Sequence, residues 1–367
     1  MKNIRLLLFS LAFVSMSLAA QDTLQNVTFS QNVKWIEGRQ LTIEGRAGEG
    51  QFHDYDRLPA FARQSAREEV WTLSENSAGI NIRFSTDSDT LHVRWVLRSV
   101  CKMPHMTDCA MNGIDLYAYD EENSTWRWAG IKLSWDGKNS GIMLQGITKK
   151  MRDYMLYLPL YTSVDSVFIG VNSDAQIQKL VRQTEKKPIV HYGTSIVQGA
   201  SASRAGMCST AQIGRAFDAE VINLGFSGNA RMDEIIGKVM AQIDAWCYII
   251  DCNANMTAEM LAERSLPFVK QLCQIRKDIP VVLVERTLAA NSWLKYETRQ
   301  KINDGNAELK KTYEQLLSEG FENVYYVYEK DLTAQSSEHT IDGEHYTDTG
   351  FTIYSEYMIK FLKTILK

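Results

Sequence analysis

The hydrophobic pattern of the second half of the chain constrains the fold more than any other feature. Short apolar runs recur there, and each is followed by a stretch long enough for a helix. The runs span residues 189–192, 221–224, 247–250, 281–284 and 324–328. Strands that alternate with helices predict a parallel sheet with helices on both faces. We therefore expect a three-layer α/β/α domain with a five-stranded parallel sheet over residues 189–367.

The first half of the chain follows a period-two pattern instead. Leu91, Val93, Trp95 and Leu97 alternate with polar residues, so they would share one face of a strand. Similar short runs recur at residues 79–84, 114–119, 126–133, 154–158 and 167–171. Many short strands predict an all-β sandwich or jelly roll. We place this domain at residues 21–181 and a polar linker at residues 182–188.

Residues 1–20 are typical of a secretory signal peptide. Lys2 and Arg5 precede an apolar run at residues 6–18, and small residues follow it. A membrane anchor is the alternative, but the run is shorter than the roughly 20 residues that a spanning helix needs. The sequence therefore predicts an exported protein, periplasmic or secreted, with no stable membrane span after signal removal.

Charge and cysteine content exclude several classes of protein. The formal net charge is -4, and basic residues are spread along the chain, which argues against a nucleic-acid binder. Six cysteines in 367 residues do not form a disulfide scaffold, although Cys101 and Cys109 could pair in an oxidising compartment. Neither a CxxC nor an HExxH motif is present, so we expect no metal site and no cofactor. The oligomeric state stays open.

Polar motifs follow the first and last apolar runs of the second half. Gly193 and Ser195 come directly after the first run, whereas Asp342 and His345 follow the fifth. Sites in parallel α/β sheets form beyond the carboxyl ends of the strands, so these side chains are expected at one edge. His345 could take a proton from Ser195 while Asp342 orients the ring. Each motif alone is equally typical of an ordinary turn.

Two more polar turns follow the second and third runs, at residues 223–229 and 251–255. Gly228 would let the backbone approach a ligand closely. Asn253 could donate its side-chain amide to an oxyanion. A simple turn or a helix cap is the alternative for both.

The four turns, in this order, resemble the SGNH/GDSL hydrolase superfamily, whose sequence blocks carry Ser, Gly, Asn and a DxxH pair. The resemblance implies a Ser-His-Asp triad of Ser195, His345 and Asp342. It also implies an oxyanion hole made by the N–H groups of Ser195 and Gly228 and the side chain of Asn253. Two positions depart from the pattern, since the usual Gly-Asp-Ser reads Gly-Thr-Ser and Asp251 stands where Gly is usual.

A second resemblance covers the first half. Residues 103–106 and Gly113-Ile114-Asp115-Leu116-Tyr117 are similar to a β domain that is named for its GxDLY motif and precedes a subset of SGNH hydrolases. Together the two resemblances cover nearly all of the mature chain. Asp115 and Tyr117 could contact ligand or belong to a packed strand. His105 and Asn229 are candidate substrate contacts.

These resemblances predict an exported serine esterase, specifically a carbohydrate O-acetylesterase that acts on acetylated polysaccharide or oligosaccharide. A lipase or lysophospholipase is the alternative within the same class. A non-catalytic glycan-binding protein that keeps the fold is the alternative from another class. A metal-dependent deacetylase has little support, because the His residues and carboxylates are scattered.

Overall fold

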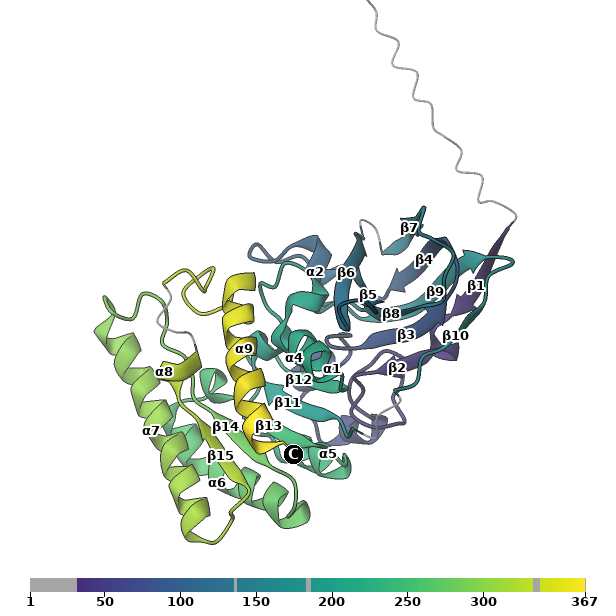
Figure 1. Cartoon of the computed structure of the whole chain (residues 1–367). Helices are drawn as coiled ribbons and strands as arrows, with labels where there is room; N and C mark the ends of the chain where they lie inside the picture. The colour runs from purple at the N-terminus through teal and green to yellow at the C-terminus, as the bar shows by residue number, and fades with distance from the viewer. Residues whose placement is uncertain (1–31, 135–136, 183–185, 333–336, 367) are drawn as a thin grey trace, which may run out of the picture.

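The computed structural model describes residues 32–134, 137–182, 186–332 and 337–366. The expected signal peptide at residues 1–20 and residues 183–185 of the expected linker lie outside this range. An antiparallel β region and an α/β region lie side by side (Figure 1). Across the described part of the chain, none of the helices has both the length and the apolar character needed to cross a membrane.

Two antiparallel sheets build the N-terminal region and confirm the predicted β sandwich. The first sheet has the strand order β1 (Val33–Glu37), β9 (Val164–Asn172), β4 (Thr90–Leu97) and β7 (Lys138–Gln145). The second has the order β10 (Ile177–Lys179), β3 (Asn81–Thr86), β8 (Arg152–Tyr157), β5 (Ile114–Asp120) and β6 (Thr125–Lys132), with β2 (Thr42–Glu44) beside β3. Val93 and Trp95 of β4 share one buried core with Ile82 and Phe84 of β3, so the two sheets pack face to face.

The C-terminal region contains the predicted five-stranded parallel sheet. Its strand order is β12 (Val221–Gly225), β11 (Ile189–Gly193), β13 (Cys247–Asp251), β14 (Val281–Val284) and β15 (Val324–Val327). Side chains alternate between two cores. Ile189 belongs to one core, whereas Val190 and Tyr192 belong to the other. Both faces of this sheet are therefore buried, as in other parallel sheets.

Helices cover both faces of the parallel sheet (Figure 1). Residues of α5 (Glu234–Gln242), α6 (Ala258–Ile275) and α7 (Tyr296–Ser318) share one core with it. Residues of α4 (Ser209–Phe217) and α9 (Asp348–Ile365) share the other. The short helices are α1 (Glu68–Ser74), α2 (Asp108–Met111), α3 (Ser195–Gln198), α8 (Glu329–Leu332), η1 (Gly38–Gln40), η2 (Ala60–Gln64), η3 (Ala205–Met207) and η4 (Asn253–Asn255).

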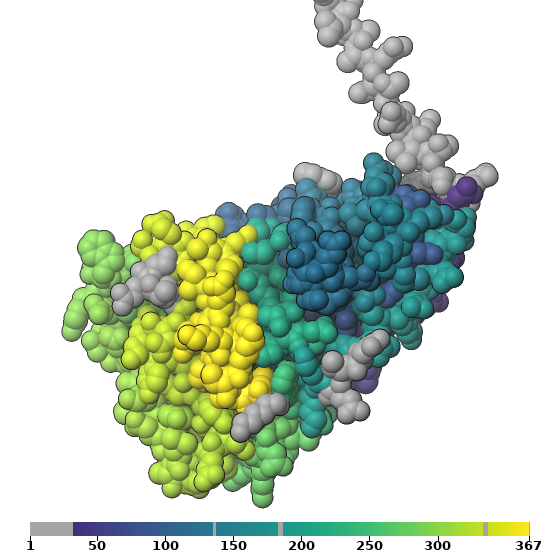
Figure 2. Space-filling model, viewed as in Figure 1, coloured from purple at the N-terminus to yellow at the C-terminus, as the bar shows by residue number. Residues whose placement is uncertain are grey.

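The two regions share their hydrophobic cores. Trp71 of α1 packs in the core beneath α5 and α6, and Tyr157 of β8 packs in the core beneath α4 and α9. Arg57 is fully buried, and its Nη1 donates to the carbonyl oxygens of Asn223 (3.0 Å) and Gly225 (2.7 Å). The space-filling view accordingly shows the two regions in contact along a continuous boundary (Figure 2).

All six cysteines are free thiols. Cys247, Cys252 and Cys273 are buried. The pairing considered for Cys101 and Cys109 does not occur in the structure, where both residues are half-buried.

Candidate active site

A narrow cavity of about 40 Å³ opens beyond the carboxyl ends of β11, β13 and β14. Ser195 and His345 both line it, together with Asn255 and Asp251. These residues come from the connections after β11 and β13 and from the segment that precedes α9, and Arg286 after β14 completes this side of the cavity. The cavity therefore lies at the sheet edge where sites form in open parallel sheets.

Ser195, His345 and Asp342 form a continuous hydrogen-bonded chain. Ser195 Oγ lies 2.9 Å from His345 Nε2, and His345 Nδ1 lies 2.7 Å from Asp342 Oδ2. Both distances are normal for hydrogen bonds. The structure thus brings together the three side chains that the sequence singled out on segments 150 residues apart.

The charge on Asp342 settles the direction of these hydrogen bonds. Burial raises the pKa of Asp342, but hydrogen bonds from the ring and the N–H of His345 and from the N–H of Glu344 outweigh it and hold the pKa at about 2. An ionised carboxylate only accepts, so the proton of the neutral imidazole sits on Nδ1. Nε2 is then free to accept the hydroxyl proton of Ser195.

The loop that carries Asp342 and His345 is preorganised by its own backbone. Asp342 Oδ1 accepts hydrogen bonds from the N–H groups of Glu344 (3.0 Å) and His345 (2.8 Å). Gly343 has φ +101°, a conformation that L side chains rarely adopt. The side chain of Glu344 forms an ion pair with Arg286, which lies at the start of the connection between β14 and α7. One short loop therefore presents both the carboxylate of Asp342 and the imidazole of His345.

Ser195 occupies the first position of α3, directly after β11. Thr194 caps this helix, and the N–H groups at a helix start have no acceptor within the helix. A Cβ on Gly193 would lie 2.4 Å from Val197 Cγ2 and 2.6 Å from the carbonyl oxygen of Asp251. Glycine is therefore required for this tight turn. An ordinary turn was one of the two interpretations that the sequence allowed for this motif.

The two asparagines that follow β13 have different surroundings in the structure. Asn253 is buried, and its Nδ2 donates to Oδ1 of Asn306 on α7 (2.7 Å). Asn255 lines the cavity with Ser195, and its Oδ1 accepts from the N–H of Ala230 (3.1 Å). Because that bond fixes the amide orientation, the NH₂ group of Asn255 is the end left for the cavity. Sequence reasoning singled out Asn253 and missed Asn255, although both stand in one five-residue turn.

Gly228 and Asn229 lie in the connection between β12 and α5. Gly228 has φ +70°, and a Cβ there would meet none of the described atoms within 4 Å, so this backbone is open on one side. Asn229 is instead engaged by protein. Its Oδ1 accepts from Arg67 Nη1 (2.9 Å), and its Nδ2 donates to the carbonyl oxygen of Ser227 (3.0 Å). The side chain of Asn229 therefore braces the loop.

A cluster of buried polar side chains adjoins the cavity. The sequence did not predict this cluster. Tyr354 of α9 donates to Asp251 Oδ2 (2.8 Å), and His191 Nε2 lies 3.4 Å from the Tyr354 hydroxyl. Burial raises the pKa of Asp251 to about 7, although the Tyr354 hydrogen bond opposes this. Burial lowers the pKa of His191 to about 3. At neutral pH His191 is therefore uncharged, and Asp251 is partly protonated.

His105 of the N-terminal region contacts His345. Its ring stacks on that of His345, with a centroid distance of 5.4 Å and an interplanar angle of 27°. The remaining motif residues, Asp115 and Tyr117, contact Arg204 rather than the cavity. The structure thus places His105 at the site and the GxDLY side chains at the boundary between the two regions.

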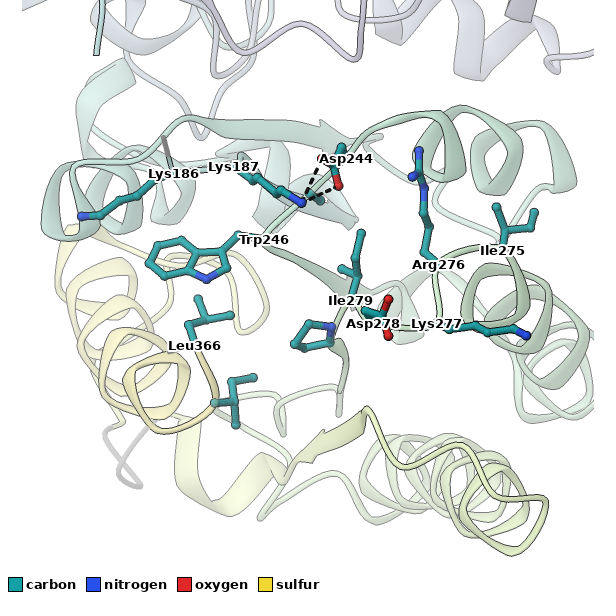
Figure 3. Close-up of a pocket in the computed structure, with 13 residues that line it drawn as sticks. Lys186, Lys187, Asp244, Trp246, Ile275, Arg276, Lys277, Asp278, Ile279 and Leu366 are labelled. Atoms are coloured by element: carbon teal, nitrogen blue, oxygen red, sulfur yellow. Dashed lines mark hydrogen bonds and ion pairs between the residues drawn. The ribbon is translucent and has the colours of Figure 1, made fainter. Parts of the chain in front are cut away.

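A larger cavity of about 730 Å³ lies at the other end of the parallel sheet (Figure 3). Its described lining comes from the segments that precede β11, β13 and β14 and from the C-terminal end of α9, and it includes no member of the Ser195 cluster. Lys187 pairs there with Asp244 (2.9 Å), and Lys186 lies 5.9 Å from the centroid of the Trp246 ring. We assign the candidate site to the smaller cavity, because the hydrogen-bonded Ser195 and His345 both line it.

Comparisons with known proteins agree with this geometry. Residues 186–363 match the GDSL-like lipase/acylhydrolase family, and residues 33–177 match the GxDLY family, the N-terminus of SGNH-hydrolase-type esterases. A search of curated proteins found no match.

Solved structures extend the comparison to both regions. A Bacteroides ovatus protein described as a GDSL-like lipase is 30% identical, with a TM-score of 0.86 over 91% of this chain and 98% of that one. The salicylyl-acyltransferase SsfX3 of a tetracycline biosynthetic pathway is 17% identical, with a TM-score of 0.74 over 92% and 100%. The acetyl xylan esterase Est2A of Butyrivibrio proteoclasticus is 12% identical, with a TM-score of 0.54 over 90% and 98%. By its match to the Bacteroides protein, the chain belongs to the GDSL-like lipase/acylhydrolase family of hydrolytic enzymes, in the group with a GxDLY-type N-terminal domain.

Proposed function

We propose that this protein is a serine esterase that removes acetyl groups from carbohydrate. The hydrogen-bonded chain from Ser195 Oγ through His345 to Asp342, with distances of 2.9 Å and 2.7 Å, is the observation that carries the proposal. The nucleophile, the base and the group that orients the base are all present in the order that a catalytic triad needs.

The triad residues have separate tasks in this proposal. Ser195 Oγ attacks the carbonyl carbon of the ester while Nε2 of His345 takes its proton. Asp342 keeps the ring in the correct tautomer and stabilises the imidazolium. The bond to the sugar oxygen then breaks, and the imidazolium returns its proton to the leaving alcohol. Water next attacks the acyl-enzyme with His345 again as base, which frees acetate and Ser195.

Three donors are proposed for the oxyanion that forms in both steps. Two are the backbone N–H groups of Ser195 and Gly228, as the sequence predicted. The third is the Nδ2 group of Asn255, in place of Asn253. Asn255 lines the cavity beside Ser195 and has its oxygen already engaged by Ala230, whereas the amide of Asn253 is engaged by Asn306. Donors fixed before the reaction stabilise the transition state at little reorganisation cost.

A small acyl group suits the cavity beside Ser195. Its volume is about 40 Å³, and its walls include Thr194, Asp251 and the ring of Tyr354. A space of this size suits an acetyl group better than a long alkyl chain. The structural similarity to an acetyl xylan esterase points in the same direction.

Exposed aromatic side chains near the loop that carries Asp342 and His345 support a carbohydrate as the alcohol component of the ester. The connection between β14 and α7 borders that loop, because Ala290 N–H donates to the carbonyl oxygen of Gly343 (3.0 Å). This connection leads to Trp293 and Tyr296, whose exposures are 75% and 76%. Aromatic rings pack well against the apolar faces of sugars. The predicted signal peptide at residues 1–20 supports export to where such glycans occur.

The proposal is tested by measuring acetate release from a panel of acetylated xylans and oligosaccharides, with the Ser195→Ala variant as control. Aryl esters with acetyl, butyryl and octanoyl groups are measured in parallel. We expect acetate release from glycans and a fall in kcat/KM of about 10-fold or more for each methylene that the cavity cannot hold. Preference for octanoyl esters without acetate release would instead indicate a lipase.

A further inference from the structure

We propose that His105, contributed by the N-terminal β region, is a positioning residue that holds the imidazole of His345 in its productive orientation. The inference rests on the proposed esterase function. It assigns to the N-terminal region a direct part in the active site. The observation behind it is the stack between the two rings, with centroids 5.4 Å apart and planes 27° apart.

The hydrogen bonds of His345 leave one motion of its ring poorly restrained. The ring is held at Nδ1 by Asp342 (2.7 Å) and at Nε2 by Ser195 (2.9 Å). Small rotations of the ring about the Cβ–Cγ bond move both nitrogens out of the original ring plane, which changes the two distances little but tilts the Nε2 lone pair away from Ser195. Proton transfer needs an aligned lone pair, so a tilt costs rate even where the distance is kept. A flat ring packed on one face limits this tilt.

The loop that carries His105 is firmly held by its neighbours. Thr107 caps α2 by accepting from Ala110 N–H (3.2 Å), and its hydroxyl donates to the carbonyl oxygen of Ser203 (2.5 Å). At the other side of His105, the N–H and the carbonyl oxygen of Cys101 both bond to the side chain of Asn112 (2.9 Å and 2.8 Å). His105 therefore sits on a short segment with both ends fixed.

The segment around Ser203 links that loop to the triad. The N–H of Ser203 donates to Oδ1 of Asp348 (2.9 Å), and its hydroxyl donates to Oδ2 of the same carboxylate. Asp348 begins α9, three residues after His345. One backbone segment thus holds both the loop that carries His105 and the helix that follows His345, which fixes the two rings relative to each other.

The GxDLY motif docks this segment on the N-terminal region. Asp115 is fully buried, and its Oδ2 accepts from Arg204 Nη1 (2.8 Å) and from the N–H of Gly206 (2.8 Å). Arg204 also donates to the hydroxyl of Tyr117 (2.6 Å). A Cβ on Gly206 would lie 2.4 Å from the Tyr117 ring, so glycine permits the close approach. The motif acts at a distance from the substrate, by placing the loop that carries His105.

The test compares His105→Ala, His105→Gln and His105→Phe, with Lys102→Ala as the control on an exposed position of the same loop. With an aryl acetate, loss of the ring in Ala and Gln should lower kcat by about 10- to 100-fold, the scale of a displacement of about 1 Å, with little change in KM. Phe keeps a flat ring and should restore most of kcat. Equal impairment of Phe and Ala, or full activity of Ala, would overturn the proposal.

A second readout does not depend on the reaction. The ring protons of His345 carry a ring-current shift from His105 in the NMR spectrum, which should disappear in His105→Ala and return in His105→Phe. If the wild-type enzyme hydrolyses no ester, the proposed function fails while this readout still decides the contact. If the ester is hydrolysed and the shifts of His345 are the same in all variants, the positioning role is wrong.

Discussion

The side-chain amide of Asn253 donates a 2.7 Å hydrogen bond to Oδ1 of Asn306, which ties η4 to α7. Asn306 also accepts from Arg286 N–H (2.9 Å) and donates to the carbonyl oxygen of Arg286 (2.9 Å). Asn253 therefore supports the connection after β14, and the amide that faces the cavity belongs to Asn255.

This division predicts different defects for two nearby variants. Asn255→Ala should lower kcat by about 10²- to 10³-fold, the usual loss for one oxyanion donor. It should also lower the free energy of unfolding by about 1–3 kcal/mol, because the N–H of buried Ala230 loses its acceptor. Asn253→Ala should lower the free energy of unfolding by about 0.5–1.5 kcal/mol, because it removes one buried hydrogen bond while Asn306 Oδ1 keeps the N–H of Arg286. Steady-state kinetics and denaturant unfolding measure the two effects. A folded Asn253→Ala variant with the larger loss in kcat would reverse the assignment.

Asp251 should make stability fall as the pH rises. Its pKa is raised by burial from 3.8 to about 7, so below about pH 4 the carboxyl is protonated in both the folded and the unfolded chain. Between about pH 4 and pH 7 the unfolded chain loses this proton first, which favours unfolding. Asp251→Asn removes the effect. The free energy of unfolding of this variant, relative to wild type, should therefore rise over that range.

Unfolding titrations of both proteins at several pH values measure this difference, which cancels the contributions of groups distant from Asp251. His191 Nε2 lies 4.0 Å from Asp251 Oδ2, and His191 contributes with the opposite sign, because burial lowers its pKa to about 3 and its neutral form is lost as the pH falls. A difference between Asp251→Asn and wild type that stays constant with pH would show that Asp251 titrates normally.

The docking of the GxDLY motif predicts a large loss of stability for Asp115→Ala. Removing one partner of a buried ion pair typically costs about 3–5 kcal/mol, because Arg204 is left without its counter-charge. Denaturant unfolding measures the loss. Asp174→Ala, which breaks the exposed pair with Lys149, is the matched control and should change stability little. Equal effects of the two variants would contradict the docking role.

Trp293 is predicted to contribute to binding of the glycan and not to the chemical step. Trp293→Ala should raise KM for an acetylated polysaccharide while leaving kcat and KM for a small aryl acetate unchanged, because only the polymer extends onto the exposed ring. Leu317→Ala, at an exposed apolar position near the end of α7, is the control. A parallel loss on both substrates would place Trp293 in the reaction instead.

The parallel sheet was the more predictable part of the fold. Its strands are buried on both faces and appear in the sequence as short, mainly apolar runs, such as Val281–Val284 in β14. β7 was missed, because Lys138–Gln145 lies half-exposed and begins with three polar residues. β10 has only three residues, too few for a period to show.

The candidate site likewise has one part that the sequence predicts and another part that it does not. Asp342 and His345 are three residues apart on one loop, so their common direction follows from local spacing, and the sheet topology brings Ser195 to the same edge. The choice between Asn253 and Asn255 depends on which amide α7 engages. The contact of His105 depends on how the two regions pack. Neither of these tertiary contacts can be predicted from a local sequence pattern.

Labelling with a fluorophosphonate tests the central claim most directly. The purified wild-type protein, Ser195→Ala and Asn253→Ala would be treated with the reagent, and the intact mass and the modified peptide would be determined by mass spectrometry. We expect one covalent adduct on wild type and on Asn253→Ala, at Ser195 in both, and none on Ser195→Ala. An unlabelled wild type, or an adduct at another residue that persists in Ser195→Ala, would contradict the assignment of Ser195 as the nucleophile.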